Sequence, residues 1–124
     1  MHIAFRADSE RIAAMTDPKL TRLCGTDDIP EGEVIRVDVD ATRVLAVYHV
    51  NGKFFATDDR CTHAEASLSE GTIEGEDIEC PFHGGSFTIA TGEPVNPPCV
   101  IALRTYPVTV ADDAVFADLS DPAD

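Results

Sequence analysis

Apolar and polar residues alternate in short runs from Thr21 onward. Within residues 34–39, Ile35, Val37 and Val39 share one face, and charged residues take two of the other three positions. This period of two is typical of a half-buried β-strand. No segment keeps a helical period for more than about three turns, and no internal repeat is visible. The pattern therefore predicts an all-β chain of short strands.

Turn residues divide these runs into hairpins. Asn51-Gly52 separates the apolar runs 44–50 and 53–57. This pair is the strongest short hairpin signal, because both central positions of the turn need a positive φ. Further hairpins are expected within residues 73–80 around Gly75-Glu76, within 87–95 around Thr91-Gly92, and between 103–110 and 114–119 through Asp112-Asp113.

Proline and the chain ends refine this picture. Pro107 falls inside the expected strand 103–110, so that strand should lie at a sheet edge or carry a bulge. Residues 1–20 are expected to form an arm, either frayed or briefly helical, and residues 120–124 a tail. The domain proper should span 21–119 as a small antiparallel β-sandwich or partly open barrel.

Composition narrows the function classes. The 124 residues include 9 Lys and Arg against 23 Asp and Glu, for a formal charge of −14. Such a chain is a poor candidate for binding nucleic acid or an anionic membrane, since both need clustered cations. We find no run of about 20 apolar residues and no signal-like N-terminus, so the expected location is the cytoplasm. There, cysteines are metal ligands or thiols more often than disulfides.

Two short clusters of Cys and His stand out from the rest of the chain. Cys61 and His63 form one, Cys80 and His83 form the other, and sixteen residues separate His63 from Cys80. Each cluster follows an expected strand, and the hairpin at Gly75 would return the second cluster beside the first. Loops on a rigid sheet are suited to metal binding, because they free the side chains while the sheet fixes their positions.

The residue types leave two kinds of metal site open. Two Cys and two His would hold one tetrahedral zinc ion, but structural zinc sites usually pair like residues two to four positions apart. Here each pair is mixed, and the first has a single residue between its members. A two-iron cluster with two Cys on one iron and two His on the other explains the mixed pairs directly. The spacing therefore favours the two-iron site over zinc.

The pattern C-x-H, sixteen residues, C-x-x-H resembles the Rieske iron–sulfur family, and the surrounding motifs agree. They are C-T-H-A at 61–64, C-P-F-H-G-G-S-F at 80–87 and A-T-G-E at 90–93. The resemblance covers about residues 21–119 and implies the Rieske fold, with a two-loop cluster-binding subdomain at about 58–98. It also implies one [2Fe–2S] cluster per chain, with Cys61 and Cys80 on the inner iron and His63 and His83 on the outer one. Asn96-Pro97-Pro98 takes the place of the family's proline loop.

Departures from the high-potential respiratory members bear on the reduction potential. Those proteins carry a loop disulfide, and the matching positions here are Ala66 and Phe82. They also use a Ser and a Tyr hydroxyl as donors to sulfur, where this chain has Gly85 and Phe87. Fewer donors stabilise the reduced cluster less, so the resemblance implies a potential near the bottom of the Rieske range of about −150 to +300 mV.

The remaining histidines and cysteines have ordinary interpretations. His2 is near the terminus, and His49 in its expected strand should pack or face solvent. Cys24 and Cys99 are expected to be small buried residues, with Cys99 near the metal site, where it would influence the ligands' surroundings. A Cys24–Cys99 disulfide is the alternative that the expected compartment disfavours.

Charge is concentrated in the region of the metal site. Residues 61–103 contain no Lys or Arg and seven acidic residues. A solvated acidic face would keep a small protein soluble, or it would steer the protein toward partners with basic docking surfaces. These two interpretations predict different salt dependence.

A small Rieske protein without a catalytic domain resembles the ferredoxin components of bacterial aromatic-ring-hydroxylating dioxygenase systems. The resemblance implies an electron carrier and not an enzyme. Its partners would be an NADH-dependent flavin reductase and a terminal oxygenase, and it would be a monomer or weak oligomer. Two alternatives stay open from the sequence: a Rieske-like small subunit of an assimilatory nitrite reductase, and a zinc-stabilised interaction domain.

Overall fold

The structure is a computed structural model that describes residues 20–62, 65–81, 85–97, 99 and 101–119. Within these residues the chain is all-β, as predicted, with two short 3₁₀ helices between strands. The expected arm at 1–20 and tail at 120–124 lie almost wholly outside the described residues. The elements are β1 (Leu20–Gly25), η1 (Thr26–Asp28), β2 (Glu33–Asp40), β3 (Arg43–Val50), β4 (Lys53–Asp58), η2 (Leu68–Glu70), β5 (Thr72–Glu74), β6 (Asp77–Glu79), β7 (Ser86–Thr88), β8 (Pro94–Asn96), β9 (Thr105–Tyr106), β10 (Val108–Ala111) and β11 (Ala114–Asp118).

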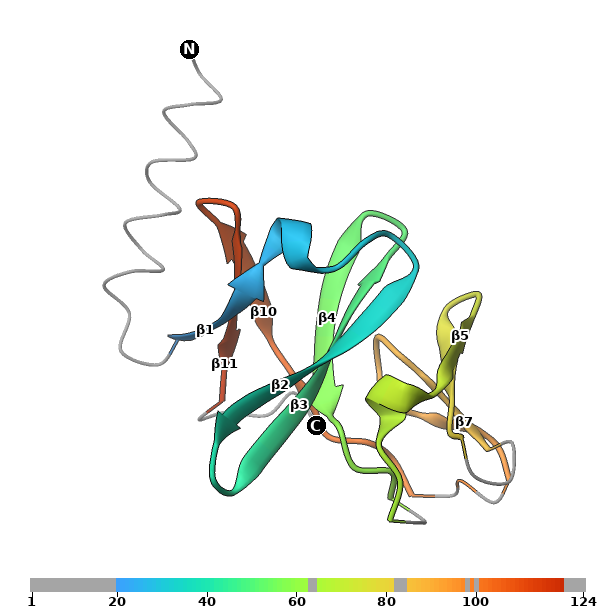
Figure 1. The fold of residues 1–124 in the computed structure, drawn as a ribbon. Coiled ribbons are helices and arrows are strands. Elements are labelled where there is room, and N and C mark those ends of the chain that lie inside the picture. Colours follow the sequence, from blue (N-terminus) through green and yellow to red (C-terminus); the bar gives the residue numbers. More distant parts are fainter. Residues whose placement is uncertain (1–19, 63–64, 82–84, 98, 100, 120–124) are drawn as a thin grey trace.

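The strands form three antiparallel sheets. Their orders are β1-β11-β10, β2-β3-β4-β9 and β5-β6-β7-β8. The four-stranded β2-β3-β4-β9 sheet stands between the other two, with the β5–β8 sheet at one end of the molecule and the β1-β11-β10 sheet at the other (Figure 1). No helix of the described residues is long and apolar enough to cross a membrane.

The hairpins form where the turn residues predict them. Asn51 and Gly52 both have positive φ, at 55° and 76°, and Val50 pairs with Lys53 across the turn. At the second hairpin Gly75 supplies a φ of 65°, between the paired residues Glu74 and Asp77. The predictions at Thr91-Gly92 and Asp112-Asp113 are confirmed in the same way by the β7–β8 and β10–β11 pairings.

The expected strand 103–110 is wrong as a single element. The chain is extended at β9, breaks at Pro107, and continues as β10 in a different sheet. Both strands lie at sheet edges, which confirms the placement expected for a proline that has no N–H to donate. Leu103 precedes the strand because its N–H donates to the carbonyl oxygen of Gly92 at 2.8 Å.

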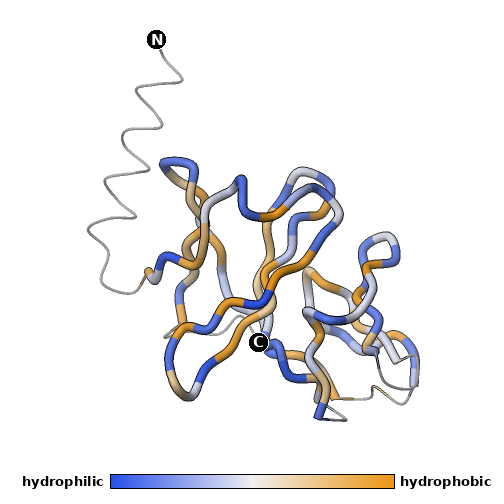
Figure 2. The backbone as a smooth tube through the Cα atoms, viewed as in Figure 1, coloured by the Kyte–Doolittle hydropathy of each residue, from blue (hydrophilic) through white to orange (hydrophobic). Residues whose placement is uncertain are grey.

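β3 is buried on both faces and so separates two hydrophobic cores. Ala46, Tyr48 and Val50 belong to the core we call the first, and Leu45 and Val47 to the second. Figure 2 shows the hydrophilic residues gathered at the hairpin tips, including the β10–β11 turn, and hydrophobic ones along the strands. The first core also contains Cys61, Ala66, Leu68, Ile78, Cys80, Phe87, Ile89, Cys99 and Leu103; the second contains Leu23, Cys24, Ile29, Ala56, Tyr106, Val115 and Ala117.

Candidate metal centre

The first loop, residues 59–67, follows β4 and is fixed by backbone hydrogen bonds. The N–H of Cys61 donates to the carbonyl oxygen of Ala66 at 2.9 Å. Asp59, which is 3% exposed, accepts from Leu68 N at its backbone oxygen and from Ser69 N at its carboxylate, at 2.7 and 2.9 Å. The loop therefore leaves the sheet and returns to η2 with Cys61 held inside the first core.

The second loop, residues 80–85, follows β6 and closes in the same way. The N–H of Cys80 donates to the carbonyl oxygen of Gly85 at 2.7 Å, five residues ahead, as Cys61 does to Ala66. Gly71, just after η2, fixes the approach of the two loops: a Cβ there would lie 2.1 Å from the backbone oxygen of Glu79. The two cysteines thus begin matched loops on adjoining segments.

The thiols of Cys61 and Cys80 converge on one part of the first core. They are 1% and 2% exposed. Cys99, in the loop between β8 and β9, lies with its Sγ 4.0 Å from Cys61 Sγ. Burial raises the pKa of the Cys99 thiol, the hydrogen bond with Cys61 lowers it, and the charge of Cys80 raises it further. Cys99 is therefore close to both predicted ligands, as its sequence position suggested.

The structure brings together the sulfur half of the predicted ligand set. His63 and His83 lie outside the described residues, so their part of the set stays a prediction. Across the described residues no three His, Cys, Asp or Glu side chains form a metal-binding group. Two buried thiols, each on a residue whose backbone N–H is hydrogen-bonded, suit a soft metal ion or an iron–sulfur cluster, whose ligands are thiolates. The donor chemistry of Cys61 and Cys80 fits such a group.

The other predicted side chains have structural roles. Cys24 is buried in the second core and Cys99 in the first, and no disulfide joins the two. His49 packs, as expected: its ring stacks on Phe54 with centroids 4.1 Å apart, and Nδ1 lies 2.8 Å from the carbonyl oxygen of Ile29.

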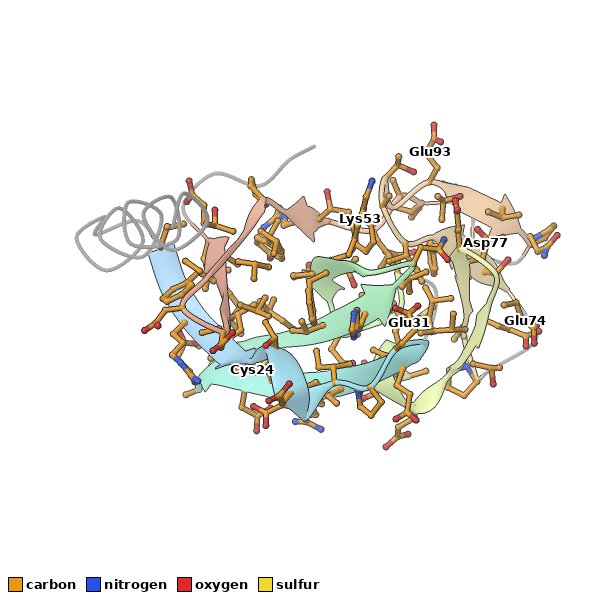
Figure 3. All side chains as sticks on the ribbon, turned by 90° about the horizontal axis from the view of Figure 1, so that it is seen from above. Cys24, Glu31, Lys53, Glu74, Asp77 and Glu93 are labelled. Carbon is orange, nitrogen blue, oxygen red and sulfur yellow. The ribbon has the colours of Figure 1, made fainter. Side chains whose placement is uncertain are left out.

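Charged side chains lie on two parts of the surface around the centre. Glu74, Asp77 and Glu93 lie spread along the end of the molecule formed by the β5–β8 sheet (Figure 3). Beside the first loop is an open groove of about 580 Å³, which the sequence analysis missed. Its lining mixes both charges: it includes four of the chain's nine basic side chains, Arg36, Arg43, Arg60 and Arg104, and the acidic residues Asp58, Asp59 and Glu65. These residues are scattered along the chain, so no local pattern marks them.

Known proteins resemble the chain over most of its length. A model of the Rieske [2Fe-2S] domain matches residues 19–107. The ferredoxin component of the p-cumate 2,3-dioxygenase system of Pseudomonas putida is 50% identical over 101 residues, which cover 81% of this chain and 86% of that protein. A solved ferredoxin of Sphingomonas yanoikuyae B1 is 48% identical with a TM-score of 0.76, covering 79% of this chain and 96% of the other. A complex of reduced oxygenase and oxidized ferredoxin in carbazole 1,9a-dioxygenase includes a chain 42% identical with a TM-score of 0.77, covering 82% and 94%.

Proposed function

The chain belongs to the Rieske [2Fe–2S] family, as a ferredoxin component of aromatic-ring dioxygenase systems, and we propose that it shuttles single electrons from an NADH-dependent flavin reductase to a terminal oxygenase. It is an electron carrier and not the catalytic component. The observation that carries the proposal is the pair of buried thiols on matched loops in a chain so similar to these ferredoxins.

We assign the cluster ligands to Cys61, Cys80, His63 and His83. When bound, the [2Fe–2S] cluster supplies the store for one electron. The two loops hold the thiols inside the first core and keep water from them, since both cysteines are nearly unexposed. The assignment of the two histidines is supported by their spacing from these cysteines and by the mixed pairs that a Rieske centre requires.

The surroundings of the thiols support a low reduction potential. Two thiolates and two neutral imidazoles balance the +2 charge of the oxidised core, so the reduced centre carries one net negative charge. Hydroxyl donors would stabilise that charge, but Gly85 and Phe87 stand where the high-potential members carry a Ser and a Tyr. Phe87 is wholly buried in the first core. The midpoint should therefore lie in the lower part of the Rieske range.

The partner assignments have different support. The solved carbazole 1,9a-dioxygenase complex pairs a similar ferredoxin with its oxygenase, which supports an oxygenase as the acceptor here. The reductase follows from membership of such a system, and we place the protein in the cytoplasm as a monomer or weak oligomer. The zinc-stabilised domain and the nitrite reductase subunit lose their support, since the relatives at 43–50% identity are dioxygenase ferredoxins.

The test is made on the purified full chain. Iron and acid-labile sulfide are measured, and the dithionite-reduced protein is examined by electron paramagnetic resonance. Two irons with the signal of mixed Cys and His ligation are expected. After the dithionite has been removed, the ferredoxin's own signal should be lost when oxidised terminal oxygenase is added, because the electron passes to the oxygenase. A colourless protein with one zinc per chain, or a midpoint above about +100 mV, would contradict the proposal.

A further inference from the structure

Cys99 is held against a predicted iron ligand by the fold. Its Sγ lies 4.0 Å from Cys61 Sγ, and the contact is buried. The backbone is fixed as well, because the Cys99 N–H donates to the carbonyl oxygen of Asn96 at 3.1 Å. Asn96 is anchored in turn, since its side-chain nitrogen donates to Ser86 Oγ at 3.0 Å. The thiol is therefore presented to Cys61 by a turn tied to β7.

Iron binding decides which sulfur donates in this contact. With both thiols protonated, either one is able to donate. A cysteine that binds iron does so as a thiolate and has no proton. If Cys61 is a ligand, as the proposed function requires, the proton between the two sulfurs belongs to Cys99. Cys99 is 2% exposed in the first core, so its contact with Cys61 is shielded from water.

We propose that Cys99 is a positioning residue for electron transfer, whose S–H donates a hydrogen bond to the ligand sulfur of Cys61 and raises the reduction potential of the bound cluster. The inference rests on the proposed function. Reduction adds negative charge to the centre and its ligand sulfurs, so a donor to one of those sulfurs stabilises the reduced form more than the oxidised form.

The neighbouring side chains show why this thiol matters. Gly85 and Phe87 bring no hydroxyl to the site. The hydroxyl of Thr62, next to Cys61 in the chain, donates to the carbonyl oxygen of Ile101 at 2.7 Å. In this chain a thiol from the β8–β9 loop thus offers a donor to Cys61, where Gly85 and Phe87 have no hydroxyl and the Thr62 hydroxyl donates elsewhere.

The first experiment compares reduction potentials of the full-length, cluster-loaded protein. Cys99→Ala should lower the equilibrium constant of one-electron reduction about three- to tenfold, which corresponds to about 28–59 mV. Cys99→Ser keeps a donor, so its equilibrium constant of reduction should fall less. Cys24→Ala is the matched control, because Cys24 is a buried free cysteine of the second core. Equal midpoints for Cys99→Ala and Cys24→Ala, or a higher one for Cys99→Ala, overturn the inference.

A second experiment leaves Cys99 in place and so does not depend on how its variants fold. In cluster-loaded Cys24→Ala protein, Cys99 is the one cysteine not assigned to iron. Its S–H stretching band in the infrared should move to lower frequency when the cluster is reduced, because the acceptor sulfur becomes more negative. A band that does not move overturns this inference and leaves the proposed function standing. A protein that holds no two-iron cluster overturns the proposed function with it.

Discussion

Gly92 joins the β7–β8 hairpin to the loop that carries Cys99 through a close backbone contact with Leu103. Replacing Gly92 by alanine measures how much this contact contributes to stability. Gly92 has a φ of 78°, and a Cβ there would lie 2.3 Å from the carbonyl oxygen of Leu103 and 3.1 Å from Thr105 Cγ2. The N–H of Leu103 donates to the carbonyl oxygen of Gly92 at 2.8 Å. The two segments would have to separate to admit the methyl group, and this hydrogen bond would weaken.

The free energy of unfolding should fall for two reasons. A left-handed backbone costs an alanine about 1–2 kcal/mol. Displacing packed backbone costs about 1–3 kcal/mol more, by analogy with overpacked cores. Alanine also makes the unfolded chain less flexible than glycine does, which offsets about 0.4–1 kcal/mol of this loss. Gly92→Ala should therefore lose about 1–5 kcal/mol in total.

Gly52→Ala is the matched control. Gly52 has nearly the same φ, 76°, but nothing lies within 4 Å of its Cβ position. The difference between the two variants therefore isolates the overlap with Leu103, about 1–3 kcal/mol. Gly71→Ala supplies the reverse case, because its φ of −84° suits alanine while its Cβ would lie 2.1 Å from a backbone oxygen.

The assay is the temperature of half-unfolding, followed by far-ultraviolet circular dichroism at one fixed scan rate. A fixed rate is needed because cluster loss makes unfolding irreversible. For a domain of this size, 1 kcal/mol corresponds to about 4–8 °C. Gly92→Ala should unfold at least about 4 °C below Gly52→Ala. Equal temperatures for these two variants would refute the argument from close contact.

Three other outcomes concern the metal site, a buried phenol and the acidic face. His83→Cys replaces a neutral ligand with a thiolate, so potentiometry should show a lower midpoint or analysis a lost cluster; an intact cluster with a raised midpoint contradicts the charge argument. Burial first, and then the hydrogen bond to Asp58, raise the pKa of Tyr106 from 10.0 to about 12. The folded state thus favours the neutral phenol, so the free energy of unfolding should fall as pH rises from about 10 to about 12. Thermal unfolding at each pH would show this fall, and it should be less steep in Tyr106→Phe. If the acidic face steers the protein to its partner, stopped-flow rates of partner reduction should fall with added salt, less so after Glu74→Gln and Glu93→Gln together; rates that ignore salt would leave only a solvating role.

The hairpins were predictable because their signals are local. A positive φ at Asn51 and Gly52 depends on the conformational freedom of those two residues and hardly on the rest of the fold. The edge position of Pro107 follows equally from its missing N–H. Leu103 shows the limit of this reasoning, since its N–H is taken by Gly92, eleven residues earlier, and it leaves the expected strand.

The places of the two predicted cysteine ligands in the fold were predictable, while the ligand set itself stays a prediction. The positions of Cys61 and Cys80, each just after a strand, are confirmed because strand ends and turn residues fix them. The sequence indicated that Cys99 lies near the metal site, but not that it contacts Cys61 in particular, 38 residues away. The pairing of β1 with β11 spans most of the chain, and no period or motif encodes it.

The double-sided burial of β3 has a consequence for engineering this carrier. Alternate residues of β3 pack into different hydrophobic cores, so a one-residue insertion in β3 would exchange the cores that Tyr48 and Val47 face. Substitutions within one core need not disturb the other. The residues of the first core, around the cluster ligands, can thus be changed to alter the reduction potential while the β1-β11-β10 sheet and the second core are left unchanged.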